Sequence, residues 1–155
     1  MTTLERVTPQ TSVRGLWPLV LDYLREVPED PWADRFDGPE GLQVHLCRTF
    51  ADGRYLTLVA RAPGAAGIVG FLVAEMRNDP KTRKLVAIVH FAYVAPGFRT
   101  KAVRLEAVKR VKEWARALGA TYVACLAARG PAMERLLGWK YAGSYQGRDF
   151  LLAEA

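Results

Sequence analysis

The sequence predicts an α/β fold with a mixed β-sheet, and three observations favour it. The 155 residues suit one domain, because domains commonly have about 100–150 residues. Half the residues are hydrophobic and a quarter are charged, as in an ordinary globular protein and unlike a disordered one. Helical spacing of apolar residues gives way to strand spacing after Arg54 and returns twice between strands. We therefore expect a single domain over 1–155, with helices in 1–53 and the sheet in 54–155.

The N-terminal part is expected to hold a short strand at Leu4–Val7 and two helices. The first helix spans Pro18–Glu26, because proline is tolerated in the first turn of a helix but not in its interior. A polar, proline-punctuated loop over 28–39 follows, and Asp37 is placed to cap the second helix. That helix carries three apolar residues on one face, namely Leu42, Leu46 and Phe50.

Six later segments read as strands, because they are apolar or alternating and are bounded by turn residues. They are Tyr55–Ala62, Gly67–Arg77, Lys84–Val94, Thr121–Ala127, Lys140–Tyr145 and Arg148–Ala153. The third is almost continuously apolar, as expected at the centre of a sheet. A helix is expected over Lys101–Leu118 and a short one over Pro131–Leu137. The longer helix should turn five residues inward, namely Leu105, Val108, Val111, Ala115 and Leu118, and Gly119 should end it.

The net charge of +6 is unevenly distributed along the chain. Between Arg77 and Arg116 there are eleven Lys and Arg against three acids, whereas Glu26–Glu40 holds six acids and one Arg. A basic chain indicates nucleic acid, a membrane surface or a small anionic ligand as a partner.

Several other classes of protein are not expected. The first ten residues lack the apolar core of a secretory signal, and the apolar stretch Gly67–Ala74 is far shorter than the roughly 20 residues that span a bilayer. Cys47 and Cys125 have no metal-ligand spacing, and His45 and His90 are too far apart to suggest zinc. We therefore expect a cytoplasmic protein without a metal, whose two cysteines are reduced and buried.

The most informative segment joins the strand ending at Val94 to the helix that begins near Lys101. Unpaired backbone N–H groups and the positive end of the helix dipole meet there, an arrangement that commonly binds phosphate. Arg99, Lys101 and Arg104 add positive charge. The alternative is an ordinary strand-to-helix turn with solvated cations, since no glycine-rich signature is present.

Two motifs resemble those of the GNAT family of acyl-CoA N-acyltransferases. Residues 94–99 are similar to its strand end, V-x-P-x-[YF]-R, and 100–105 occupy its pyrophosphate loop. Residues 133–139 are similar to its late-helix signature. The resemblance covers roughly Tyr55 to Leu152, and it implies the GNAT fold, an acetyl-CoA cofactor and transfer of an acyl group to an amine.

The resemblance also implies positions for the cofactor. The backbone of Ala92, Tyr93 and Val94 would pair with the pantetheine arm, and a backbone N–H near Val94 would polarise the acyl carbonyl. N–H groups of six consecutive residues would hold the pyrophosphate: Arg99, Thr100, Lys101, Ala102, Val103 and Arg104. The amine must lose a proton before it attacks, so a base is required.

His90 is the first candidate for that base, because imidazole accepts protons near neutral pH. Strand alternation would place His90, Ala92 and Val94 on one face. The alternative is a buried structural histidine bonded to a backbone carbonyl. Glu75 is the second candidate, and its alternative is a strand-end carboxylate paired with an arginine.

This chain departs from the family pattern at two places. Arg104 stands where family members usually have a small residue close to phosphate, and Glu134 occupies the position of a tyrosine general acid. Tyr141 and Tyr145 are candidates to replace that acid, although packing would explain them equally well. Otherwise solvent protonates the thiolate, or turnover has been lost.

The acceptor side is predicted to be the acidic N-terminal segment, where Trp32 and Phe36 would contact the substrate. The leading hypothesis is an acetyl-CoA-dependent N-acetyltransferase that acts on a primary amine of a small molecule, peptide or modified base. One alternative is a non-catalytic GNAT-like interaction module. The other is a nucleic-acid-associated family member, of the kind that phages encode. The final hairpin is a candidate surface for a homodimer.

Overall fold

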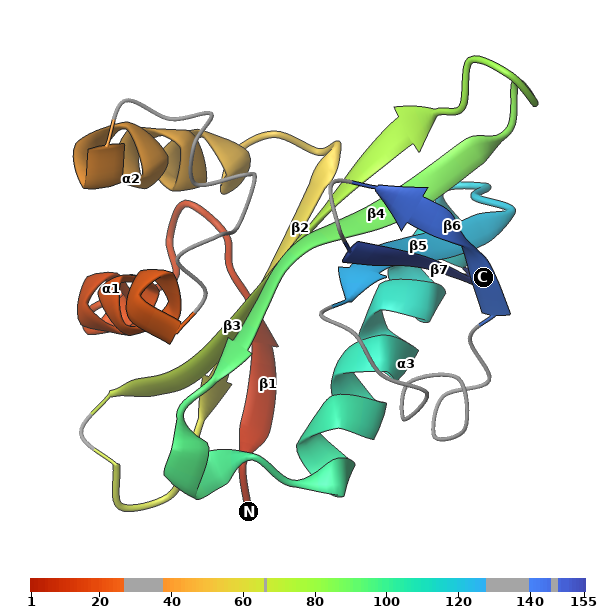
Figure 1. The fold of residues 1–155 in the computed structure, drawn as a ribbon. Helices are drawn as coiled ribbons and strands as arrows, with labels where there is room; N and C mark the ends of the chain where they lie inside the picture. Colours follow the sequence, from red (N-terminus) through yellow and green to blue (C-terminus); the bar gives the residue numbers. More distant parts are fainter. Residues whose placement is uncertain (27–37, 66, 128–139, 146–147) are drawn as a thin grey trace.

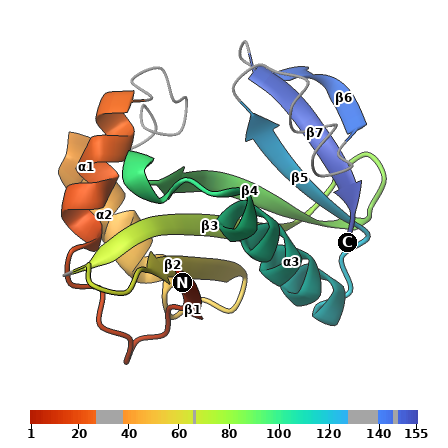
Figure 2. The same cartoon turned by 90° about the horizontal axis from the view of Figure 1, so that it is seen from below.

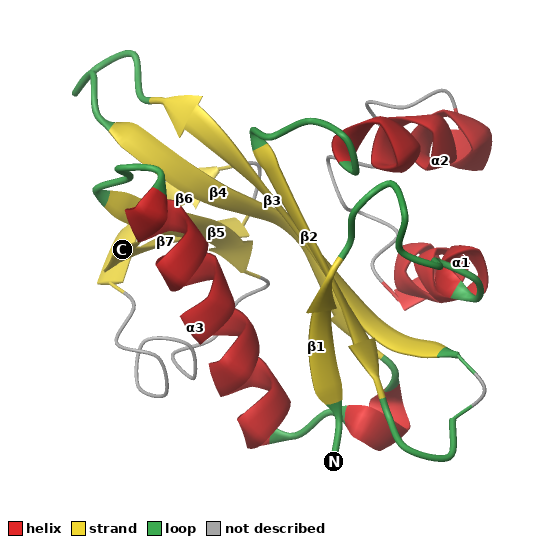
Figure 3. Ribbon diagram, turned by 180° about the vertical axis from the view of Figure 1, so that it is seen from behind, coloured by secondary structure: helices red, strands yellow, loops and turns green. Residues whose placement is uncertain are grey.

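The computed structural model describes residues 1–26, 38–65, 67–127, 140–145 and 148–155, whose strands form one seven-stranded sheet (Figure 1). The strand order is β1-β2-β3-β4-β5-β7-β6, and only the β4–β5 pair is parallel. Helices α1 and α2 cover one face and α3 covers the other (Figures 2 and 3). The predicted mixed, mostly antiparallel sheet with helices on both faces is therefore confirmed.

The elements lie within about three residues of their expected bounds. The strands are β1 Thr3–Arg6, β2 Tyr55–Arg61, β3 Ile68–Asn78, β4 Leu85–Val94, β5 Tyr122–Ala127, β6 Lys140–Tyr145 and β7 Arg148–Glu154. The helices are α1 Leu16–Glu26, α2 Gly38–Thr49 and α3 Lys101–Ala117, with a short 3-10 turn at Pro96–Phe98. The expected helix Pro131–Leu137 and residues 28–37 of the expected loop lie outside the described residues.

The face under α1 and α2 is built around aromatic side chains. Helix α1 buries Leu16, Leu19, Val20 and Tyr23, which recur at helical spacing. The ring of Tyr23 meets the rings of Phe71, Phe91 and Tyr93 edge-on, with centroids 5.8–5.9 Å apart. Helix α2 adds Leu42 and Leu46 to this cluster, as its spacing predicts. These contacts fix α1 across β3 and β4.

The opposite face packs against α3, but the prediction of its inward residues was partly wrong. Val111 and Ala115 are buried as expected, whereas Leu105 and Leu118 are 42% and 48% exposed. Val103 and Trp114 are buried in their place. The buried stripe follows the helical period from Val103, whereas Leu105, two residues later, lies on the opposite side of the helix. Leu118 is the C-cap, beyond the last residue of α3. Gly119 has a φ of +84°, which suits the predicted helix stop.

Strand β4 contains one extra residue relative to β3. Val73 pairs with Phe91, whereas its neighbour Ala74 pairs with Val89, so His90 forms a β-bulge. Before the bulge, Ala87 and Val89 face α3, and after it Phe91 and Tyr93 face α1. The predicted alternation of His90, Ala92 and Val94 on one face is wrong, because a bulge adds a residue without advancing the pairing.

The pairing of β4 with β5 ends at the same place. Val86–Val89 pair with Tyr122–Cys125, and no further pair forms between the two strands in the part of the chain described. β4 continues along β3 to Val94, while β5 continues along β7 to Ala127. The two strands diverge beyond Val89, as Figure 2 shows.

Within the described ranges, no helix has the length and apolarity to cross a membrane.

Gly70 should be intolerant of any side chain, because β3 is closely flanked by β2 and β4 there. A Cβ at Gly70 would lie 2.9 Å from the carbonyl oxygen of Tyr93 and 3.2 Å from the Cβ of Ala60. We expect Gly70→Ala to lower the free energy of unfolding by about 1–3 kcal/mol, measured by urea denaturation. Gly53→Ala is the control, since a Cβ there meets no atom within 4 Å. Equal stability of the two variants would contradict the close packing.

Candidate active site

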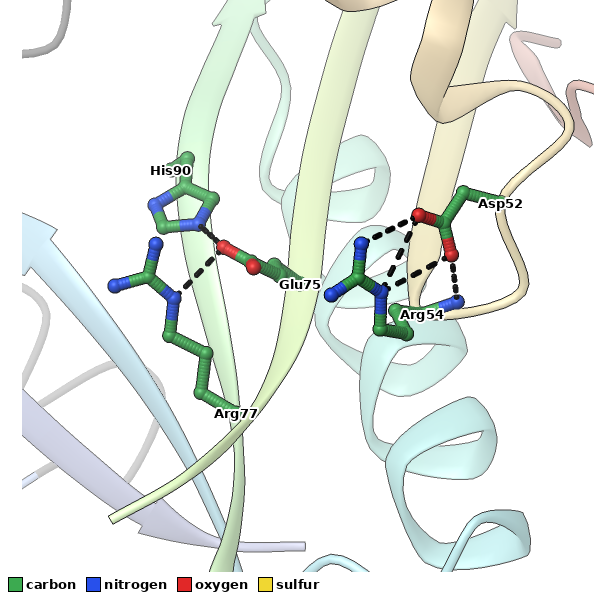
Figure 4. Close-up of polar contacts among 5 residues, drawn as sticks. All are labelled: Asp52, Arg54, Glu75, Arg77 and His90. Carbon is green, nitrogen blue, oxygen red and sulfur yellow. Dashed lines mark hydrogen bonds and ion pairs between the residues drawn. The ribbon is translucent and has the colours of Figure 1, made fainter. Parts of the chain in front are cut away.

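Glu75 and His90 form a buried pair on the face of the sheet under α1 and α2. The Nε2 atom of His90 lies 2.7 Å from Oε2 of Glu75 (Figure 4). The two residues are 7% and 9% exposed, respectively. Glu75 alternates with Phe71 and Val73 along β3, and His90 lies on the same face because it follows Val89, which faces α3. The two candidate bases are therefore one hydrogen-bonded unit.

Arg77 completes the arrangement by donating from Nε to Oε2 of Glu75 at 2.9 Å. Burial alone would raise the pKa of Glu75, but the hydrogen bonds and positive charge of His90 and Arg77 outweigh it and lower the pKa below 4.5. Glu75 is therefore ionised at neutral pH. Its stabilising effect is present above pH 4.5 and is lost as the pH falls through the lowered pKa. The arginine partner expected for Glu75 is present, together with a second partner that the sequence did not indicate.

Two further side chains, His45 and Tyr55, lie beside this pair and were not singled out from the sequence. Tyr55 on β2 is directly opposite Glu75 on β3. His45 on α2 meets the Tyr55 ring edge-on, with centroids 5.9 Å apart. Burial lowers the pKa of His45, and so does the charge of His90. Only the β2–β3 register could have placed Tyr55 here, and only the packing of α2 could have placed His45, since they are 20 and 30 residues from Glu75 in sequence.

Beyond the bulge, β4 presents backbone groups to the side from which β5 has diverged. The N–H of Ala95 donates to Val69 on β3 at 2.8 Å. Because successive residues of a strand direct their N–H and C=O to opposite sides, Tyr93 also faces β3, while Ala92 and Val94 face away from it. Of the three residues expected to bind pantetheine, two therefore have backbone groups on the open side.

The N-terminus of α3 has open N–H groups near this edge. Thr100 caps the helix, accepting from the Val103 N–H through Oγ1 at 3.2 Å, and its carbonyl accepts from the Arg104 N–H at 3.3 Å. The N–H groups of Thr100, Lys101 and Ala102 have no acceptor among the described residues. Of the six expected phosphate donors, these three are open. The Arg104 side chain is exposed to solvent.

Arg99 is held by α1 and by the end of β4. Its Nη2 donates to both carboxylate oxygens of Glu26, at 2.8 and 2.6 Å, and its Nε donates to the Val94 carbonyl at 2.6 Å. The hydroxyl of Tyr93 donates to Glu26 at 3.0 Å. The hydrogen bond from Arg99 is the main cause of the lowered pKa of Glu26. Arg99 thus ties the α3 turn to the last residue of α1.

The remaining predicted positions are not placed. Trp32, Phe36 and Glu134 lie outside the described residues, and Tyr145 is the last residue of β6, with its side chain also outside them. Cys47 is exposed, contrary to the expectation that both cysteines are buried. Cys125 is buried opposite Val89, and burial raises its pKa to about 12. It is therefore a protonated thiol at neutral pH and not a nucleophile.

These features combine three chemical capacities within one stretch of β4 and the turn after it. The open backbone of Ala92 and Val94 can pair with an amide-containing chain. The open N–H groups at the α3 N-terminus can bind an anion. The Glu75–His90 pair can accept a proton, because its carboxylate orients the imidazole. Among the described side chains, no group of three or more His, Cys, Asp or Glu is placed to hold a metal ion.

Comparison with solved structures shows the same fold in several acetyltransferases. A predicted acetyltransferase with acetyl-CoA from Clostridium acetobutylicum is 13% identical, with a TM-score of 0.73 and 94% of each chain covered. An aminoglycoside acetyltransferase from an uncultured soil metagenomic sample is 19% identical, with a TM-score of 0.61, over 84% of this chain and 82% of that one.

A ribosomal-protein-alanine N-acetyltransferase from Brucella melitensis biovar Abortus 2308 is 18% identical, with a TM-score of 0.62, over 88% of this chain and 87% of that one. No curated protein sequence matches the chain. The model of the acetyltransferase (GNAT) family matches residues 17–138, which include both helices of the α1–α2 face, the Glu75–His90 pair and the α3 turn. The chain therefore belongs to the acetyltransferase (GNAT) family and is an acyltransferase.

Proposed function

We propose that the protein is an acetyl-CoA-dependent N-acetyltransferase that acetylates a primary amine. The observation that carries this proposal is the buried Glu75–His90 pair at the bulge where β4 leaves β5. The proposed proton acceptor, His90, and the open backbone groups of Ala92 and Val94 lie on one short stretch of β4. The family supplies the acyl-CoA chemistry, and one structural neighbour is described with acetyl-CoA.

The donor set of this chain fits a CoA thioester. Ala92 and Val94 would pair with the amide groups of pantetheine, and the N–H groups of Thr100, Lys101 and Ala102 would bind the pyrophosphate. The side chains of Lys101 and Arg104 are exposed beside this turn and add positive charge. The Val94 carbonyl already accepts from Arg99, so we assign the Val94 N–H and both groups of Ala92 to the cofactor. The bound thioester would supply the activated acyl carbon.

The proton of the acceptor would go to His90. With Glu75 ionised, the Nε2–H of His90 donates to it, and Nδ1 is the nitrogen with a lone pair. As the amine nitrogen bonds to the acyl carbon, the amine would lose a proton to Nδ1 through water, because Nδ1 itself is buried. The thiolate that leaves the acyl carbon would take a proton from solvent. A backbone N–H near Val94 would stabilise negative charge on the carbonyl oxygen.

Direct transfer to the amine is favoured over an acyl-enzyme. Cys125 is the described cysteine on β5 beside the bulge, and its raised pKa of about 12 keeps it protonated. A cysteine that carried the acyl group would need to be a thiolate at neutral pH.

The acceptor is an amine of a small molecule, a peptide or a modified base. Structural neighbours include proteins named for aminoglycosides, ribosomal-protein alanine and glucosamine-6-phosphate, which are all amines. The acidic segment Glu26–Glu40 would attract a cationic amine toward the α1–α2 side of the molecule. Trp32 and Phe36 remain our proposed contacts for the acceptor, and Tyr145 our proposed acid for the thiolate if solvent does not serve.

Acetyl-CoA should bind through backbone N–H groups at the start of α3. Lys101 is the first helical residue, where proline is tolerated, and Thr100 has the extended backbone (φ −114°, ψ 157°) that precedes proline readily. Lys101→Pro removes one N–H together with the charge, whereas Lys101→Ala removes only the charge. By calorimetric titration we expect Lys101→Pro to bind acetyl-CoA about tenfold or more weakly than Lys101→Ala, because a hydrogen bond to a charged group is lost.

Equal affinity of these two variants would remove the α3 N–H groups from the cofactor site. Failure of the unaltered protein to bind millimolar acetyl-CoA would contradict the proposed function itself. Circular dichroism should show the same helix content in both variants.

His90→Gln should lower kcat by about 100-fold or more, because glutamine can still donate to Glu75 but cannot accept the proton. The dissociation constant for acetyl-CoA should change by less than about twofold, since the side chain faces away from the open edge of β4. The release of thiol from acetyl-CoA with a panel of amines measures kcat, and calorimetry measures the dissociation constant. Lys109→Gln on the exposed side of α3 is the control and should match the unaltered protein. Loss of both turnover and cofactor affinity would make His90 a structural residue.

A further inference from the structure

Tyr55 is placed to act on Glu75 from the neighbouring strand. It is the first residue of β2, and its Cα partner across the β2–β3 ladder is Glu75. Side chains of such directly opposed residues emerge on the same face with Cβ atoms about 4.5–5.5 Å apart. The Tyr55 side chain therefore shares the α1–α2 face with Glu75 and His90.

The ring of Tyr55 is held from two sides. His45 of α2 meets it edge-on at 5.9 Å between centroids and an interplanar angle of 85°. The guanidinium of Arg54 lies 5.9 Å from the ring centre, and Asp52 fixes that guanidinium through hydrogen bonds of 2.8–3.3 Å (Figure 4). A ring packed in this way presents its hydroxyl in a defined direction at little further cost in side-chain entropy.

Glu75 has room for another donor. His90 and Arg77 both donate to Oε2, and an ionised carboxylate has two oxygens with about four acceptor positions in all. Burial raises the pKa of Tyr55, and the negative charge of Glu75 raises it further. Tyr55 thus lies opposite the carboxylate on β2, while Arg77 of β3 and His90 of β4 donate to it.

We propose that Tyr55 is a positioning residue: its hydroxyl fixes the Glu75 carboxylate so that Oε2 faces Nε2 of His90. This inference rests on the proposed function, in which His90 takes the proton of the amine. The charged and titratable groups around the pair are then His45 of α2, Arg54 and Tyr55 at the start of β2, and Arg77 of β3, within the described ranges.

The effect can be observed in the protein alone, because the chain has only two histidines. In ¹⁵N-edited spectra, His45→Gln and His90→Gln assign the imidazole signals. Tyr55→Phe keeps the ring and removes only the hydroxyl. We expect the Nε2–H proton of His90 to move upfield and to exchange faster with water in Tyr55→Phe, because its hydrogen bond to Glu75 loosens. Tyr122→Phe on β5 is the matched control and should leave this signal unchanged.

Kinetics supply a second readout. Tyr55→Phe should lower kcat by about three- to tenfold, as for loss of one hydrogen bond, with KM for acetyl-CoA unchanged. In a Glu75→Gln background the same change should have no further effect on kcat, since Tyr55 would act through Glu75. If Tyr55→Phe lowers kcat by the same factor with and without Glu75→Gln, the inference is overturned and Tyr55 has a packing role only.

The outcomes separate the inference from the proposed function. An unchanged His90 Nε2–H signal in a folded Tyr55→Phe protein overturns the positioning role, even if the unaltered protein acetylates amines. Absence of acetyl transfer by the unaltered protein overturns the function, and the spectra still decide the contact. Should Tyr55→Phe fail to fold, the Glu75→Ala spectrum replaces it, because alanine leaves no side-chain acceptor for the Tyr55 hydroxyl. Faster exchange of the Tyr55 hydroxyl proton with water than in the unaltered protein supports the contact, and an unchanged exchange rate contradicts it.

Discussion

The extra residue at His90 determines which side chains of β4 face α3 and which face α1 and α2. Without it, simple alternation after Val89 would still place His90 on the α1–α2 face, but it would turn Phe91 and Tyr93 toward α3. With it, His90 and Phe91 both lie on the α1–α2 face, where Glu75 is available. The bulge also coincides with the last β4–β5 pair, after which the backbone of Ala92 and Val94 is no longer covered by a neighbour. One local irregularity therefore links the proposed base to the proposed cofactor edge.

Two carboxylates with lowered pKa values stabilise this arrangement from either end. Glu75 of β3 is bonded to His90 of β4 across the two strands and to Arg77 of its own strand. Glu26 holds the end of α1 to Arg99 and Tyr93, where β4 passes into the α3 turn. The second group is largely exposed, so solvent weakens it, and its effect is to orient the Arg99 side chain more than to add stability. Helix α1, on the proposed acceptor side, and the turn proposed to hold the cofactor are thereby in direct contact.

Much of the fold followed from the sequence, because its elements are strongly patterned. The continuous apolar run of β4 predicted a central strand, and the turn before α3 carried the family motif. That Ala92 and Val94 face the opposite side from His90 could not be predicted, since a bulge leaves no mark in the spacing of apolar residues. Tyr55 and His45 were missed for a related reason: their closeness to Glu75 comes from strand register and helix packing, not from any local motif. Arg99 was expected at phosphate, but the structure pairs its side chain with Glu26, a partner 73 residues away.

Hydrogen exchange at β4 shows directly whether the backbone of Ala92 and Val94 is open and whether acetyl-CoA covers it. The N–H groups of Phe91 and Tyr93 face β3, whereas those of Ala92 and Val94 face the side that β5 has left. In the free protein, we expect fast exchange at the amides of Ala92 and Val94 and slow exchange at those of Phe91 and Tyr93. Saturating acetyl-CoA should then slow exchange at Ala92 and Val94 specifically. If these two amides already exchange slowly in the free protein, or if acetyl-CoA leaves their exchange unchanged, β4 has no open edge that binds the cofactor.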